Sequence, residues 1–81
     1  MLKILNGNDE IIKLREGMLF EIVKHYYNNT FMGYNLMLGN ELIDTYDEEE
    51  FAVAVLGEIC RRMNNCVGFI NIHEVNKLLE V

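Results

Sequence analysis

Tyr46–Cys66, YDEEEFAVAVLGEICRRMNNC, decides the fold, because every local signal in this stretch predicts one amphipathic α-helix. Asp47 is a favourable N-cap residue, and Glu50 three positions later completes a capping box. Apolar residues recur at helical spacing and define one face: Ala52, Val55, Leu56, Ile59 and Met63. Such a face needs an apolar partner surface, which the rest of the chain is expected to supply.

The charges at the two ends of this expected helix agree with its dipole. Glu48–Glu50 lie near the positive N-terminal end, and Arg61 and Arg62 lie near the negative C-terminal end. Each such charge contributes about 0.3–1 kcal/mol at an exposed site. Tyr46 and Phe51 flank the predicted start and can close as a hydrophobic staple.

The first third of the chain predicts short strands. The turn-forming residues Asn6–Asp9 separate two aliphatic runs, so we expect a hairpin with strands near 2–5 and 10–14. Met18–Tyr27 is rich in β-branched and aromatic residues, which favours a strand. An amphipathic helix from about 10 to 27 is the alternative, because apolar residues in this range also fit a helical period.

The sequence that follows Tyr27 favours strands. Asn28-Asn29 suits a two-residue turn, and alternation in Thr30–Leu38 puts apolar residues on one face: Met32, Tyr34, Leu36 and Leu38. Gly39-Asn40 then turns the chain into Glu41–Tyr46, where alternation puts Ile43 and Thr45 on one side and Tyr46 on the other. The predicted fold is therefore α+β in a single domain of residues 1–81: antiparallel hairpins and a β-meander packed against one long helix, about 47–64.

Two interpretations compete for the C-terminal quarter. In the first, Cys66–Ile72 forms a short strand and Asn71 caps a short closing helix. In the second, Met63–Glu74 is a degenerate EF-hand-like loop in an all-α fold, with Gly68 and Glu74 at the sixth and twelfth positions. Met63 and Val67 stand where ligand oxygens belong, so calcium affinity is expected to be poor.

Charge limits the classes of partner. The net charge is −6, and no Lys or Arg occurs between Lys24 and Arg61. A basic patch for phosphate contacts is therefore absent from the middle of the chain, and both direct nucleic-acid binding and an anionic membrane surface are disfavoured. No apolar run approaches the length of a membrane span, and the first residues lack the long apolar region of a signal peptide, so we expect a cytoplasmic protein.

Six of the seven acidic residues in this gap, all but Glu58, are the candidate partner-binding residues. They are Glu41, Asp44, Asp47, Glu48, Glu49 and Glu50. Their negative electrostatic field can attract a host protein with a basic surface. The competing interpretation is a solvated helix start, because the helix dipole alone explains acids at Asp47–Glu50.

Little in the sequence indicates catalysis. There is no serine, which excludes a serine nucleophile, and Cys60 and Cys66 are expected to be reduced thiols. Cys60 flanks the apolar helix face and is predicted to be a buried small hydrophobe. The two cysteines and two histidines lack the paired spacing of a zinc site. No catalytic, metal or cofactor-binding residue is predicted.

Aromatic residues cluster in the expected meander: Tyr26, Tyr27, Phe31 and Tyr34. They could form an interface. Core packing is the preferred interpretation, because strands select aromatic side chains.

Two segments within residues 2–60 resemble parts of small accessory proteins of bacteriophages and mobile elements: KILNGNDEIIKL and LGNELIDTYDEEEFAVAVLGEI. These proteins typically carry a K-I-L-like opening strand and a Y-x-x-E-E-x-A-x-x-V-L-like strand-to-helix junction. In this chain the junction residues are Tyr46, Glu49, Glu50, Ala52, Val55 and Leu56. The resemblance implies an α+β domain that interacts with host components, and Cys66–Val81 departs from the pattern.

Three function hypotheses follow. The first is a non-enzymatic acidic binding module, acting as an inhibitor of a host nucleic-acid-binding or defence protein in the manner of an anti-CRISPR protein or a DNA mimic. The second is a structural homo-oligomer, such as a homodimer built on the aromatic strands. The third is a degenerate EF-hand-like metal or ligand sensor on Met63–Glu74.

Overall fold

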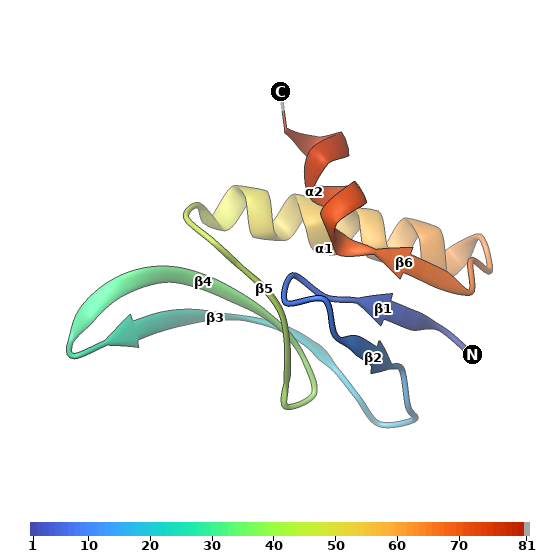
Figure 1. The fold of residues 1–81 in the computed structure, drawn as a ribbon, viewed down its shortest axis with the longest axis horizontal. Helices are drawn as coiled ribbons and strands as arrows, with labels where there is room; N and C mark the ends of the chain where they lie inside the picture. The colour runs from blue at the N-terminus through green and yellow to red at the C-terminus, as the bar shows by residue number, and fades with distance from the viewer. Residues whose placement is uncertain (81) are drawn as a thin grey trace.

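The computed structural model describes residues 1–80, which form an α+β fold as the sequence predicts (Figure 1). Along the chain the elements are β1 (Lys3–Leu5), β2 (Ile11–Lys13), β3 (Phe20–Tyr27), β4 (Thr30–Leu38), β5 (Glu41–Tyr46), α1 (Glu49–Asn64), β6 (Phe69–Asn71) and α2 (Ile72–Leu79). The helices lie on one side of the strands in Figure 1. The all-α alternative with an EF-hand-like loop is wrong, because β6 and the start of α2 occupy the segment where that loop was expected.

Strands β3, β4 and β5 form an antiparallel meander in that order. This confirms a strand for residues 20–27 and excludes the helix alternative. Asn28 and Asn29 have φ angles of 49° and 62°. A two-residue turn of type I′ requires positive φ at both positions, which asparagine tolerates better than most residues.

A β-bulge in β5 changes which of its side chains are buried. Leu36 pairs with Asp44 and Met37 pairs with Leu42, so Ile43 is the extra residue. The extra residue breaks the regular alternation. Ile43 and Tyr46 are therefore both buried, whereas regular alternation predicted opposite sides.

The second sheet has the order β2–β1–β6. The hairpin of β1 and β2 was predicted, but β6 pairs with β1 in parallel, which local patterns did not indicate. This pairing places Ile4 beside Ile70, and both side chains are fully buried. Helix α1 makes the return crossing that a parallel pairing requires.

One apolar core joins the two sheets and the two helices. Its buried residues are Leu2, Ile4, Ile12, Leu36, Leu38, Ile43, Tyr46, Ala52, Val55, Ile59, Ile70, Ile72 and Val75. The predicted face of α1 is confirmed: Ala52, Val55 and Ile59 are fully buried, while Leu56 and Met63 pack against the core and are partly buried.

Asn6 links the two sheets at the β1–β2 turn. Its side chain is buried, with 3% exposure, and Oδ1 accepts hydrogen bonds from the N–H groups of Asn8 and Glu10 at 2.9 and 2.8 Å. Nδ2 donates to the Leu42 carbonyl of β5 at 3.0 Å. A buried amide with all of these partners satisfied fixes the turn against the meander.

The start of α1 differs from the prediction. The N-cap is Glu48, whose carbonyl accepts the first helical hydrogen bond from Ala52, and its side chain makes no capping bond. The capping box on Asp47 and Glu50 is therefore wrong. The contact between Tyr46 and Phe51 is present, with ring centroids 5.4 Å apart. This aromatic contact holds the chain at the entry to the helix.

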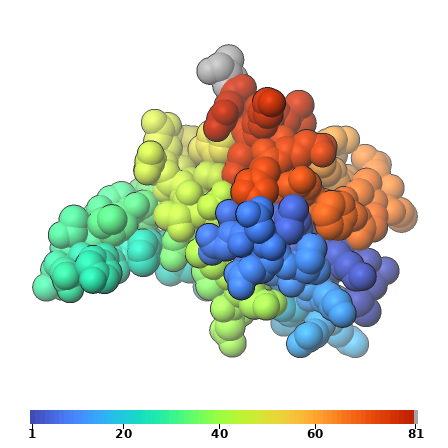
Figure 2. All heavy atoms as spheres, viewed as in Figure 1, coloured from blue at the N-terminus to red at the C-terminus, as the bar shows by residue number. Residues whose placement is uncertain are grey.

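Two burial predictions are also wrong. Cys60 is exposed and is not a buried hydrophobe, and both cysteines are free thiols. Of the four aromatic residues predicted to be core, Tyr34 is partly buried and packs against the core. Tyr26, Tyr27 and Phe31 are exposed by 56%, 67% and 44%, so they are not core residues. The β3–β4 hairpin carries them away from the body, as the green and teal atoms in Figure 2 show.

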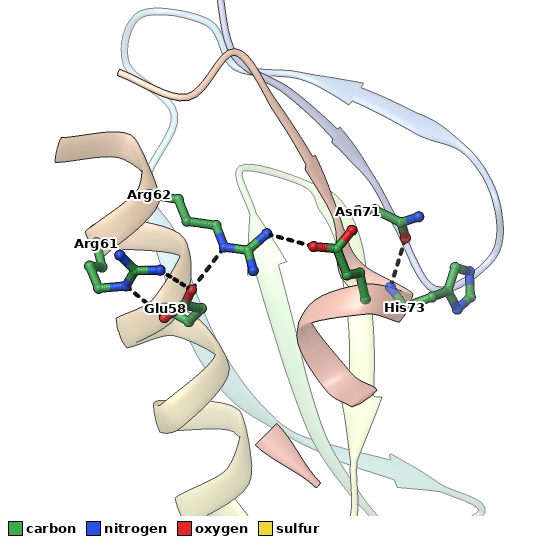
Figure 3. Close-up of polar contacts among 6 residues, drawn as sticks. Glu58, Arg61, Arg62, Asn71 and His73 are labelled. Carbon is green, nitrogen blue, oxygen red and sulfur yellow. Dashed lines mark hydrogen bonds and ion pairs between the residues drawn. The ribbon is translucent and has the colours of Figure 1, made fainter. Parts of the chain in front are cut away.

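Polar contacts fasten the C-terminal helix. The Asn71 side chain accepts a hydrogen bond from the His73 N–H at 3.0 Å, so the predicted cap of α2 is confirmed (Figure 3). The His73 Nε2 atom lies 2.8 Å from Asp9 Oδ1 in the β1–β2 turn. These contacts tie the first turn of α2 to one end of the second sheet, where β6 ends and the β1–β2 turn follows β1.

Candidate functional site

A hollow of about 420 Å³ lies where the end of β5, the start of α1 and the end of α2 meet. Its lining residues are Asp44, Thr45, Tyr46, Asp47, Glu48, Phe51, Asn76 and Glu80. We call it the acidic pocket, because four of these residues carry carboxylates. Of residues 1–80, no Lys or Arg lines it.

Asp44 is held in place from three directions. Its Oδ2 accepts a hydrogen bond from Asn76 Nδ2 at 2.9 Å, and its Oδ1 accepts one from the Thr45 N–H at 2.8 Å. Gly7 lies against the same carboxylate, where a Cβ atom would come within 2.5 Å of it. Only glycine leaves room for this approach, so the β1–β2 turn helps to position Asp44.

Asn76 of α2 connects Asp44 to Tyr46. The Tyr46 hydroxyl donates to Asn76 Oδ1 at 2.8 Å. Burial raises the pKa of the Tyr46 phenol well above its ordinary value, and the charge of Asp44 raises it further, against the opposing effect of the hydrogen bond with Asn76. The phenol therefore stays protonated and acts as a donor. This leaves the Asn76 NH₂ group to donate to Asp44 and fixes the orientation of the amide.

The aromatic side of the acidic pocket is formed by Tyr46 and Phe51. Their planes are inclined at 33°, and both rings belong to residues that line the pocket. An aromatic face attracts a cation that lies within about 6 Å of the ring centroid. Carboxylates and aromatic rings in one hollow therefore suit an organic cation.

The nearest arginines in the sequence are occupied at the far end of α1. Glu58 Oε2 accepts hydrogen bonds from Arg61 at 2.6 Å and from Arg62 at 2.8 Å (Figure 3). Hydrogen bonds from Arg61 first, and then from Arg62, lower the pKa of Glu58 to about 2. Arg62 also lies 3.5 Å from Glu74 of α2. The two ends of α1 thus differ: one is neutralised, and the other carries acids without a basic neighbour in the pocket lining.

The structure brings together only part of the predicted acidic strip. Asp44, Asp47 and Glu48 line the acidic pocket. Glu41 lies at the other end of β5 and lines a separate hollow beside Asn6 and Glu10. Glu49 and Glu50 are exposed in the first turn of α1 but are not among the pocket residues.

Sequence reasoning missed five members of the pocket: Thr45, Tyr46, Phe51, Asn76 and Glu80. Tyr46 and Phe51 were recognised only as a hydrophobic staple. Asn76 and Glu80 lie more than one element away from β5 in the chain, and α2 brings them back over it. The polar position of Asn76 beside the apolar residues of α2 was the one signal available.

Two further properties of residues 1–80 concern the geometry of a metal site and the length of a membrane span. Within residues 1–80, no group of three or more His, Cys, Asp or Glu side chains is placed to hold a metal ion. No helix in the described part of the chain is long and apolar enough to cross a membrane.

No family model, curated protein or solved structure matches this chain. The functional argument therefore depends on the fold and on the acidic pocket.

Proposed function

We propose that this protein is a non-enzymatic binding module that receives a basic side chain of a partner protein in the acidic pocket. The observation that carries the proposal is the union of four carboxylates and two aromatic rings in one hollow, with no Lys or Arg in the lining contributed by residues 1–80. Like charges gathered in this way repel one another, and an incoming cation relieves that repulsion.

Arginine is the side chain that suits the pocket best. Its planar guanidinium can donate paired hydrogen bonds to a carboxylate and stack on an aromatic face at the same time. Asp44 is already oriented by Asn76, so it loses little freedom on binding. Asp47 and Glu48 are exposed and can close on the cation from the solvent side.

The net charge of −6 extends the effect of the pocket over a longer range. Summed charge of one sign accelerates the approach of an oppositely charged partner, and salt weakens this steering. Occlusion of a basic surface is the mode of action that follows. A host nucleic-acid-binding or defence protein is the partner class that the resemblance to phage and mobile-element proteins adds to the proposal.

Binding of a fluorescent hexa-arginine peptide tests the proposal. We expect Asp47→Asn/Glu48→Gln to weaken binding about tenfold or more, since one charged hydrogen bond contributes roughly 1.5–3 kcal/mol. The matched control is Glu49→Gln/Glu50→Gln, which removes the same charge from the next two positions, in the first turn of α1, but leaves the pocket lining intact.

The control should weaken binding less than about threefold, through the long-range field alone. Raising NaCl from about 0.05 to about 0.5 M should weaken binding by the wild-type chain, because it shortens the Debye length. Equal losses in the two double variants would contradict a role for the pocket. Binding that does not change with salt would contradict the electrostatic mechanism. Affinity capture from a host extract with the same pair of variants extends the test to natural partners.

A further inference from the structure

The rest of the chain covers one edge of the meander and leaves the other edge open. At the β5 edge, the Gly7 N–H donates to the Ile43 carbonyl at 2.8 Å and Asn6 Nδ2 donates to the Leu42 carbonyl at 3.0 Å. The β1–β2 turn therefore covers that edge. The other edge is β3, an eight-residue strand with β4 on one side only.

The hydrogen-bond pattern shows which groups of β3 point outward. Gly39 N–H donates to the Leu19 carbonyl at 2.9 Å, so Leu19 faces β4. In an antiparallel pair, facing and outward residues alternate. The backbone groups of Phe20, Ile22, Lys24 and Tyr26 are therefore directed away from β4. Within residues 1–80, none of them takes part in a hydrogen bond to another segment.

Large apolar side chains surround this open edge. Leu19 is 77% exposed and Val23 is 43% exposed, and the tip adds Tyr26 and Tyr27. Tyr26 contacts Phe31 edge to face, with ring centroids 5.6 Å apart. The hairpin arm that bears them extends from the body in Figure 2. A long edge strand with exposed apolar neighbours is a template for pairing with another strand.

We propose that two copies of this chain associate through β3, forming a continuous six-stranded antiparallel sheet across a twofold axis at Val23. In this register the outward groups of Ile22 face those of Lys24 in the second copy, and Phe20 faces Tyr26. Each of these pairs can exchange two backbone hydrogen bonds. The proposal involves no residue of the acidic pocket and does not depend on the proposed function.

Side-chain chemistry selects this register. A twofold axis perpendicular to the sheet keeps each side chain on its own face of the sheet. The alternative registers arise when this axis is moved along β3 by one residue. An axis at Lys24 would set two lysines against each other. An axis at Ile22 would set Glu21 against Val23. The axis at Val23 pairs Glu21 with His25, an acceptor with a donor, on both sides of the axis.

The same register also brings the arm of one copy to an apolar hollow on the other. Met18, Leu19 and Phe20 line a second hollow of about 420 Å³, together with Leu2, Leu14 and Met63. Tyr26 and Tyr27 of the second copy lie opposite Phe20 and Leu19. The twofold repeats this contact, so each exposed arm covers the exposed hollow of its twin.

The expected interface is small. Fully burying an aromatic side chain removes about 150–250 Å² from water. Burying half of four such side chains per copy removes on the order of 800 Å² in the pair, before the paired backbone is counted. A compact specific interface buries about 1,200 Å². We therefore expect a reversible dimer that dissociates on dilution, and not an obligate one.

Sedimentation velocity from about 10 μM to about 1 mM tests the association. The wild-type chain should shift from monomer to dimer in this range, and Val23→Lys should weaken the association at least tenfold, because two lysines would meet at the axis. The matched control is Val53→Lys, the same change at an exposed position of α1. A wild-type chain that stays monomeric at 1 mM overturns the proposal, as does an equal effect of the two variants.

Cross-linking tests the register at the level of single residues. Val23→Cys, in a background where Cys60 and Cys66 are replaced by serine, should oxidise to a covalent dimer, because facing side chains at the axis lie about 4.5–5.5 Å apart at Cβ. Val53→Cys in the same background should not. Glu21→Lys and His25→Glu should each weaken dimerisation about fivefold, and the double variant should restore it. Failure of restoration, or cross-linking at Val53 alone, overturns the register. Circular dichroism checks that each variant remains folded.

Discussion

Replacing Asn6 with alanine should show how strongly one side chain holds the two sheets together. Asn6→Ala removes two hydrogen bonds from the N–H groups of Asn8 and Glu10 and one to the Leu42 carbonyl, each of 3.0 Å or less. At a net contribution of about 1 kcal/mol for each bond, the loss is about 3 kcal/mol. A domain of this length has a total stability of about 4–12 kcal/mol, so the variant should lose a quarter or more of it.

Urea denaturation followed by circular dichroism at 222 nm measures this loss. With an m-value of about 1.5 kcal/mol/M, the midpoint should fall by about 2 M urea. Asn8→Ala is the matched control, because Asn8 is exposed and contributes its backbone N–H, which the substitution keeps. It should stay within about 0.5 kcal/mol of wild type. If Asn6→Ala also stayed within that margin, Asn6 would not be what joins the sheets.

Three further predictions concern stability and access. Ile59→Ala should lower the free energy of unfolding by about 2–5 kcal/mol, whereas Val53→Ala, at a position that is 53% exposed, should change it by less than about 0.5 kcal/mol; chemical denaturation compares the two. The pKa of Glu58 is lowered to about 2 in the folded state, so its contribution to stability should be complete above about pH 4.5 and should be lost as the pH falls towards 2. An acid titration should therefore show a smaller loss of stability over that range in Glu58→Gln than in Glu49→Gln. Both cysteines should react with a thiol reagent in the native protein, without denaturant, and slow reaction of one thiol would contradict the exposure of that side chain.

The uneven charge of α1 follows from pairing and not from composition alone. Arg61 and Arg62 share Glu58, and Arg62 also reaches Glu74, so these cations are already paired with carboxylates. The acidic residues at the N-terminal end of α1 have no such basic neighbour in the pocket lining. A basic partner would therefore be steered towards the acidic pocket and away from the C-terminal end of the helix.

Local chemistry was sufficient to predict most of the elements. Asn28-Asn29 marked a tight turn, the period of Thr30–Leu38 marked a strand, and Asn71 marked the cap of α2, and each is present. Local chemistry was misleading at Asp47, because this favourable capping residue lies one position before the actual N-cap, Glu48. It was also misleading at Cys60, because the edge of an amphipathic stripe is decided by what packs against it.

The sequence by itself determined the α+β class, the order of the strands in the meander, the apolar face of α1 and the concentration of acids before it. These properties depend on neighbours within a few positions, where periodicity, turn residues and helix dipoles act directly. Only the tertiary structure decided that β6 returns to β1, that a bulge buries both Ile43 and Tyr46, and that Asn76 and Glu80 complete the acidic pocket. Those outcomes depend on which surfaces fit together once the chain has folded, and a contact between distant residues leaves no period or spacing in the sequence.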